Sequence, residues 1–120
     1  MSDIIGSLST TFVETVVFTK RIVRLGLEEP LRELQMELAA NPTVGNVDPG
    51  TGGLRKARVP DPKRGRGKRR GARVHYLWMP SRELIYLVFV YSKNETATLT
   101  RDQKTALSRI VREIKQELMR

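Results

Sequence analysis

Basic side chains crowd one stretch of the sequence, and their types and spacing suit chemistry on a phosphate. Residues 51–73 hold ten lysines and arginines against a single acid, Asp61. The rest of the chain holds twelve basic and twelve acidic residues, so the formal charge of +9 collects in this stretch. A concentrated positive charge attracts phosphates and speeds encounter with them. The sequence therefore predicts a nucleic-acid-binding protein.

Within this stretch, two predicted strands flank a basic loop. Alternation puts Lys56 and Arg58 on one face of the first strand, and Arg73 and His75 on one face of the second. If the strands pair as a hairpin, three cations converge at one place. Converging cations can hold a phosphate and stabilise the extra negative charge of a transition state. The alternative is a solvated basic face beside a flexible loop.

The loop between these strands, residues 60–71, separates its cations with glycine and can follow an irregular phosphate backbone without reading bases. Its other interpretations are a disordered insertion or a cargo signal. Tyr91, at the end of a predicted strand, is a candidate for stacking on a base, although strand aromatics also serve as core. The predicted RNA-binding set is Arg55, Lys63, Arg64, Arg66, Lys68, Arg69, Arg70 and Tyr91.

Other catalytic chemistries find little support in the residues. The chain has no cysteine, which excludes disulfides and thiolate metal ligands. His75 is the only histidine and has no cluster of carboxylates near it in the sequence, so we predict no metal and no cofactor. A role for His75 as a general base stays open as an alternative. The sequence lacks a Gly-x-Ser-x-Gly elbow and a phosphate loop ending in Gly-Lys-Ser or Gly-Lys-Thr.

The elements that must position these side chains follow from periodicity and caps. At 120 residues there is room for one domain, which we place at 11–120 behind a loose leader, residues 1–10. The N-terminal half is predicted to hold a strand over Phe12–Phe18, a short helix and a longer helix. The short helix is capped by Thr19, turns Ile22, Val23 and Leu25 to one face, and stops at Gly26. The longer helix has Glu28 and Glu29 at its start, places Leu27, Leu31, Leu34 and Leu38 at helical spacing, and ends at Asn41–Pro42.

The C-terminal half is predicted to hold three strands and a helix. The strands span Leu54–Val59, Ala72–Trp78 and Leu84–Tyr91, the last apolar on both faces and therefore central. Thr100 and Gln103 form a capping box that starts the final helix. We read residues 43–53 as a loop. This element order indicates an α/β or α+β fold, with helices able to cover one face of the sheet. Without a secretory signal or a membrane-length apolar run, the predicted location is cytoplasmic.

Three sequence blocks together resemble the RelE/HigB toxins of bacterial type II toxin–antitoxin modules, within the RelE/ParE superfamily. They are Gly50-Thr51-Gly52-Gly53-Leu54-Arg55-Lys56-Ala57-Arg58-Val59, then Gly67-Lys68-Arg69-Arg70-Gly71-Ala72-Arg73-Val74-His75-Tyr76, then Tyr91-Ser92-Lys93-Asn94-Glu95. The resemblance covers about residues 11–119 and is closest to the HigB-type branch. It implies a small antiparallel sheet with two N-terminal helices and a C-terminal helix, as in microbial ribonucleases.

The resemblance also implies an activity and partners. The expected activity is ribosome-dependent cleavage of messenger RNA, which inhibits translation. The expected partners are messenger RNA, the ribosome, a HigA-like DNA-binding antitoxin, and operator DNA through the antitoxin complex. Carried over by position, the catalytic residues are Lys56, Arg58, Arg73 and Lys93. Asn94 stands where the best-known branch has a further arginine.

The expected mechanism needs no metal, because the RNA 2′-OH is its own nucleophile. Lys56 would take the 2′-OH proton, and Arg73 would bind the phosphate oxygens with its planar fork. Arg58 and Lys93 would share the remaining electrostatic work, one of them acting as acid. Two alternatives stay open: a non-catalytic nucleic-acid or ribosome-binding module, and a ParE-like gyrase inhibitor that acts on a protein.

Overall fold

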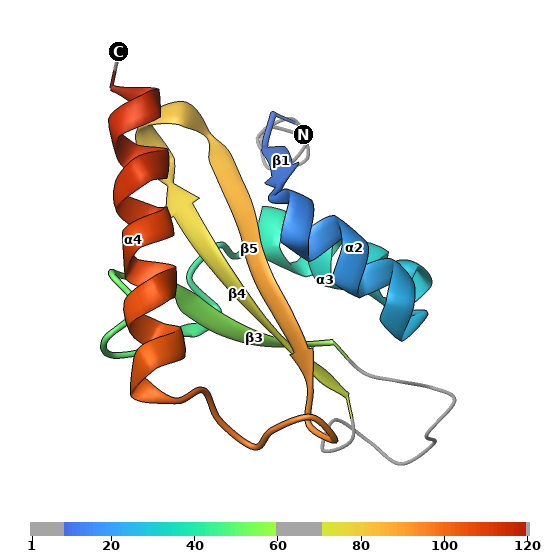
Figure 1. Cartoon of the computed structure of the whole chain (residues 1–120). Coiled ribbons are helices and arrows are strands. Elements are labelled where there is room, and N and C mark those ends of the chain that lie inside the picture. Colours follow the sequence, from blue (N-terminus) through green and yellow to red (C-terminus); the bar gives the residue numbers. More distant parts are fainter. Residues whose placement is uncertain (1–8, 60–70, 120) are drawn as a thin grey trace.

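The computed structural model describes residues 9–59 and 71–119, which form an α+β fold with three helices and a five-stranded mixed sheet (Figure 1). The strands lie in the order β1-β5-β4-β3-β2. The elements are β1 (Thr11–Glu14), α2 (Val16–Leu25), α3 (Glu28–Ala40), β2 (Asn46–Val47), β3 (Arg55–Val59), β4 (Ala72–Met79), the 3₁₀ turn η3 (Pro80–Arg82), β5 (Leu84–Ser92) and α4 (Arg101–Leu118).

The first strand is shorter than predicted, because a helix begins inside the predicted span. β1 ends at Glu14, and Thr15 rather than Thr19 caps α2, its hydroxyl accepting from the Phe18 N–H at 3.1 Å. The Val-rich start favours a strand by propensity, but burial of Phe18 and Ile22 at helical spacing outweighs that preference. Val23, predicted to face inward, is exposed.

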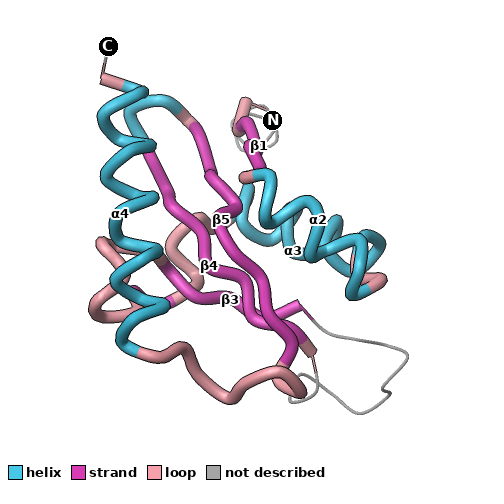
Figure 2. The backbone as a smooth tube through the Cα atoms, in the orientation of Figure 1, coloured by secondary structure: helices cyan, strands magenta, loops and turns pink. Residues whose placement is uncertain are grey.

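The second helix agrees with its prediction in detail. α3 starts at Glu28, buries Leu31, Leu34 and Leu38, and ends with Asn41 as its C-cap. The turn before α3 is set by Gly26, which takes the left-handed conformation that closes α2 (φ 69°). Two helices joined by one turn are thereby laid side by side against the sheet (Figure 2).

The sheet is mixed, not antiparallel as predicted. The strands β2, β3, β4 and β5 pair antiparallel in that order, but β1 pairs parallel to β5, with Thr11 opposite Leu84. β5 lies inside the sheet, as its two apolar faces predict, although β4 is the middle strand. The predicted loop 43–53 contains the two-residue strand β2.

Helices cover both faces of the sheet, whereas we predicted cover on one. α2 and α3 pack on one face, where Phe18 and Leu38 meet Tyr76 and Leu87. α4 packs on the other face, where Leu107 and Val111 join the cluster of Leu54, Leu77, Val88 and Tyr91. Figures 1 and 2 show the sheet between these two layers. The strands must therefore be apolar on both sides, except where the basic residues lie.

Two of the predicted segments fall wholly or mostly outside the described residues. Of the predicted leader 1–10, only residues 9 and 10 are described, and β1 follows at once. The basic loop 60–71 is described only at Gly71. Among the described helices, none combines the length and the apolar character needed to cross a bilayer.

The capping box at the start of α4 gives a test of local stability. Thr100 Oγ1 accepts from the Gln103 N–H at 3.1 Å, and the Gln103 side chain accepts from the Thr100 N–H at 2.8 Å. Thr100→Ala removes the first bond and is expected to lower the free energy of unfolding by about 1 kcal/mol. Thr100→Ser keeps the hydroxyl and serves as the control. Equal loss in both variants, measured by urea denaturation, would contradict the capping role.

Candidate functional site

The two basic strands pair as the sequence predicts. In the antiparallel register of β3 and β4, Arg58 lies opposite Arg73 and Lys56 lies opposite His75. Directly opposite residues share a face with Cβ atoms about 4.5–5.5 Å apart. The three predicted cations and His75 are thus gathered on one face of the hairpin, the face that α4 covers farther along the strands.

A cleft of about 790 Å³ opens beside this cluster. Lys56, Arg58 and Arg73 line it from the sheet, and Glu33 and Glu37 line it from α3. The loop that carries β2, residues 44–49, closes another side. Because β2 pairs only with Arg55 and Lys56, the outer edge of β3 beyond them borders the cleft. A volume of this size accommodates a nucleotide-sized ligand.

Arg73 is the most unusual charge in the site. Its side chain is only 6% exposed, and its Nη1 has no hydrogen-bond partner among the described residues. Burial lowers the pKa of the guanidinium, the neighbouring charge of Arg58 lowers it further, and Tyr91 acts in the opposite direction. A buried, unpartnered donor on a cation is costly, which points to an anion as its natural ligand.

Two more buried polar atoms lack partners, and both come from residues beside Arg73. They are Nδ1 of His75 and the hydroxyl of Tyr91, in side chains 0% and 2% exposed. With Arg73 Nη1 they make up every such atom that the described part of the chain contains. Native proteins satisfy nearly all buried polar groups, so three orphans in one place mark a functional site.

His75 belongs to a buried chain of ionisable groups that the sequence did not predict. Its Nε2 lies 2.8 Å from Asp48 Oδ2, and Lys104 Nζ of α4 lies 2.9 Å from Asp48 Oδ1. Asp48 is nearly buried in the glycine-rich loop, where the Thr51 hydroxyl donates to its carbonyl at 2.7 Å. The chain Lys104–Asp48–His75 therefore ties the loop and α4 to the middle strand of the sheet.

The ionisation of this chain follows from its surroundings. Burial raises the pKa of Asp48, but hydrogen bonds from His75 and Lys104 outweigh burial and leave it below its ordinary value. Burial lowers the pKa of His75, and Asp48 only partly opposes that effect. Asp48 is thus ionised and His75 neutral near pH 7. An ionised carboxylate only accepts, so His75 Nε2–H donates to it and Nδ1 carries the free lone pair.

Tyr91 reaches this face because of a bulge in β5. The pairing of β4 and β5 shifts between His75 and Tyr76, so that Phe89 and Leu87 find partners and Val88 has none. Without the extra residue, simple alternation would put Tyr91 on the opposite face from Val88. With it, Tyr91 lies opposite Arg73, its ring stacked on His75 at 5.9 Å. Burial raises the pKa of its phenol, which stays protonated at neutral pH.

Burial of the Tyr91 ring does not fit the predicted stacking on a base. The ring lies against His75 and near Phe89, whose centroid is 6.2 Å away. Its polar group, the hydroxyl, is also buried and has no partner among the described residues. Bulges of one residue leave little trace in the sequence, so the turn of Tyr91 toward Arg73 could not be read from alternation.

The remaining predicted site residues are not among those that line the cleft, or they lie outside the described residues. Arg55 points to the other side of β3 and donates to the Gly45 carbonyl at 2.8 Å, which gives it a structural contact. Lys93 lies in the turn after β5 and is not among the described residues that line the cleft. An ion pair between Arg21 and Glu95 holds that turn to α2. Lys63, Arg64, Arg66, Lys68, Arg69 and Arg70 lie outside the described residues.

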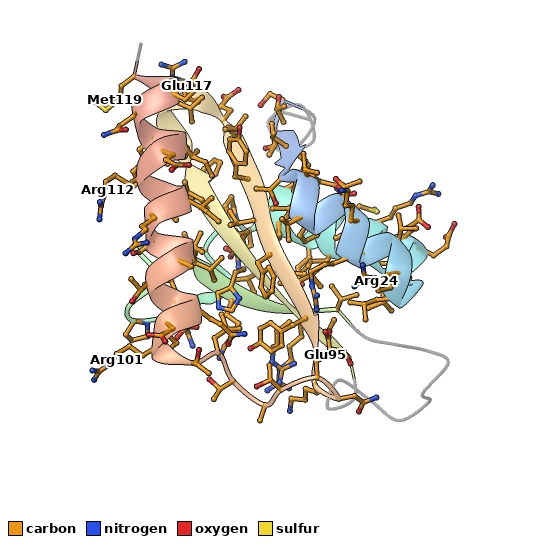
Figure 3. The ribbon with its side chains drawn as sticks, in the orientation of Figure 1. Arg24, Glu95, Arg101, Arg112, Glu117 and Met119 are labelled. Atoms are coloured by element: carbon orange, nitrogen blue, oxygen red, sulfur yellow. The ribbon has the colours of Figure 1, made fainter. Side chains whose placement is uncertain are left out.

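Basic residues elsewhere on the surface differ from those in the cleft. Arg101 and Arg112 extend outward from α4 into solvent (Figure 3).

Across residues 9–59 and 71–119, no group of three or more histidine, aspartate or glutamate side chains is placed to hold a metal ion. No protein-family model matches the sequence.

The buried histidine gives a pH test of this site. Because folding lowers the pKa of His75, the unfolded chain binds a proton below about pH 6.5 that the folded chain resists. Stability therefore falls as the pH drops below about 6.5, by at most about 1.4 kcal/mol per pH unit. His75→Gln is expected to flatten this slope between pH 7 and 5.5 in urea titrations. As His75 is the only histidine, equal slopes in both proteins would contradict its burial as a neutral ring.

Proposed function

We propose that this protein is a metal-independent endoribonuclease that cuts messenger RNA on the ribosome, as the toxin of a toxin–antitoxin pair. The observation that carries the proposal is the buried Arg73 guanidinium, with an unpartnered Nη1, at the edge of a cleft that Lys56 and Arg58 also line. That arrangement suits one phosphate of a nucleic acid. The resemblance of the three basic blocks to the RelE/HigB toxins supports the same activity.

The reaction is an internal transfer at one phosphate. The 2′-oxygen forms a bond to phosphorus, and the bond from phosphorus to the 5′-oxygen breaks, which leaves a 2′,3′-cyclic phosphate and a 5′-hydroxyl. Negative charge rises on the phosphate oxygens on the way to the transition state. Prepositioned cations stabilise that charge more than they stabilise the substrate, which is what lowers a barrier.

The cations of the cleft divide this work. Arg73 binds the phosphate oxygens, because a planar guanidinium can donate two parallel bonds to them. Arg58, its cross-strand partner, adds charge at the exposed side. Lys56 is half-buried in the same wall of the cleft and accepts the proton of the 2′-hydroxyl. Lys93, in the turn beyond Tyr91, contributes to the field around the message.

The partners of this activity follow from charge and from the resemblance. A chain of net charge +9 needs an acidic cover to be silenced, and a HigA-like antitoxin that fills the basic cleft would do so. Operator DNA would be bound through that antitoxin. The ribosome would supply the message in an extended form, and its own RNA would attract the basic surface.

Arg73 separates this function from the two alternatives. We expect Arg73→Gln to lower the rate of message cleavage in a translation extract about 10²–10³-fold, because a prepositioned donor to the transition state is lost. Arg112→Gln removes an exposed arginine from the outer side of α4 and serves as the matched control, with a rate near that of the wild type. Cut sites are read by mapping the 5′ ends of the fragments.

Other outcomes of these experiments would assign this protein a different function or a different mechanism. Growth arrest without any cut message would favour a non-catalytic ribosome-binding module or a gyrase inhibitor. Cleavage that persists when the nucleotide at the cut carries 2′-deoxyribose would overturn the internal-transfer mechanism. Thermal melting of the Arg73→Gln protein distinguishes lost chemistry from lost folding, and relief of a buried, unpartnered charge predicts a melting temperature no lower than that of the wild type.

A further inference from the structure

The proposed reaction needs a proton donor for the departing 5′-oxygen. Arginine does not give up its proton in proteins, so Arg58 and Arg73 cannot serve. Lys56, once assigned to accept the 2′-OH proton, is not free to donate at the same moment. Lys93 lies in the turn after β5, beyond the residues of that strand that pair with β4. The donor must therefore come from a group next to Arg73 that is protonated at neutral pH.

Tyr91 meets each of these requirements. It is the cross-strand partner of Arg73, so its side chain starts about 5 Å from that of Arg73 on the same face. Its hydroxyl is buried and has no partner in the described structure, the same condition as Arg73 Nη1. Burial has the largest effect on both pKa values, but Arg73 lowers the pKa of the Tyr91 phenol and Tyr91 raises the pKa of the guanidinium, so the two groups are near enough to act on each other. A phosphate bound at Arg73 Nη1 would therefore lie near the second orphan. Arg73 Nη1 can only donate a hydrogen bond, whereas the Tyr91 hydroxyl can both accept and donate one.

We propose that the Tyr91 hydroxyl protonates the 5′-oxygen as the bond from phosphorus to that oxygen breaks. The proposal rests on the ribonuclease function set out above. The 2′-oxygen gives its proton to the Lys56 amine and bonds to phosphorus. The Tyr91 proton passes to the 5′-oxygen, which leaves as a hydroxyl. Tyr91 becomes a phenolate beside the Arg73 cation, and a proton returns from Lys56 or from water after release.

The buried chain Lys104–Asp48–His75 acts as the support for Tyr91. The imidazole lies flat against the tyrosine ring, at 5.9 Å between centroids and 28° between planes, and Asp48 fixes the imidazole by its bond to Nε2. Phe89 lies near the ring as well. These contacts limit the ring to one position and thereby aim its hydroxyl. Asp48 and His75 are thus positioning residues and do not touch the RNA.

The Tyr91 hydroxyl is covered in the free protein. Arg73 lines the cleft, whereas the Tyr91 hydroxyl lies behind the surface. Catalytic hydrogen bonds commonly tighten only when substrate is bound.

A change of leaving group isolates the proton donor. Two short RNAs are compared, identical except that one carries sulfur in place of the bridging 5′-oxygen at the cut. A thiolate leaves without being protonated, so a variant that lacks the acid recovers on the sulfur substrate. Tyr91→Phe keeps the stacked ring and loses only the hydroxyl. We expect it to cut the oxygen substrate about 10²–10³-fold more slowly than the wild type, and to cut the sulfur substrate at nearly the wild-type rate.

Each other outcome of this comparison has a defined meaning. Equal loss on both substrates, or no loss on either, overturns the role of Tyr91 while the ribonuclease function stands. Failure of the wild type to cut either RNA, with ribosomes present, overturns the function itself and this proposal with it. Lys93→Met is the matched control for the rival donor: recovery on the sulfur substrate by that variant, and not by Tyr91→Phe, would assign the proton to Lys93.

A second measurement covers the case in which Tyr91→Phe folds poorly. Replacement of Tyr91 by 3-fluorotyrosine keeps the hydroxyl and the ring but makes the phenol more acidic. The alkaline limb of the pH–rate profile should then move to lower pH on the oxygen substrate and stay in place on the sulfur substrate. An unmoved limb on the oxygen substrate would overturn the proposal.

Discussion

Among the described residues, the Arg73 guanidinium is buried with no carboxylate partner, and the rest of the site depends on this condition. Removal of a charge from water is expensive unless a partner of opposite sign replaces the lost solvent. The charge that bears most strongly on Arg73 is another cation, Arg58. The free protein therefore carries a cost at Arg73 that a phosphate or an acidic partner would offset. Strain of this kind is commonly retained where a ligand is to be bound.

The surrounding fold gives Arg73 its setting. Cover of the sheet by helices on both faces keeps β4 dry along its length, so a cation in that strand is buried with it. The bulge at Val88 brings a phenol to the same face, and the contacts of Asp48 with His75 and Lys104 tie the loop after β2 and the helix α4 to β4. Segments far apart in the sequence thus meet beside Arg73.

Much of this arrangement could be predicted from the sequence, and the failures have physical causes. Alternation was enough to put Lys56, Arg58 and Arg73 on one face, since β3 and β4 pair without interruption there. Propensity failed at Val16, where burial of one helix face outweighed a preference for strand. The bond from Asp48 to His75 spans 27 residues and joins a loop to a strand, so no periodic signal carries it.

The most direct test of the central claim is to neutralise the phosphates of a bound RNA one at a time. A short RNA with 2′-O-methyl at the cut, which cannot be cleaved, is prepared with a single methylphosphonate at each linkage in turn. If one phosphate enters the Arg73 site, neutralisation of the linkage at the cut should weaken binding about 10–100-fold, as expected for a charged hydrogen bond. Each other linkage should matter much less, and the difference should vanish in Arg73→Gln. Equal weakening at every linkage would contradict the claim and leave only a general attraction to charge.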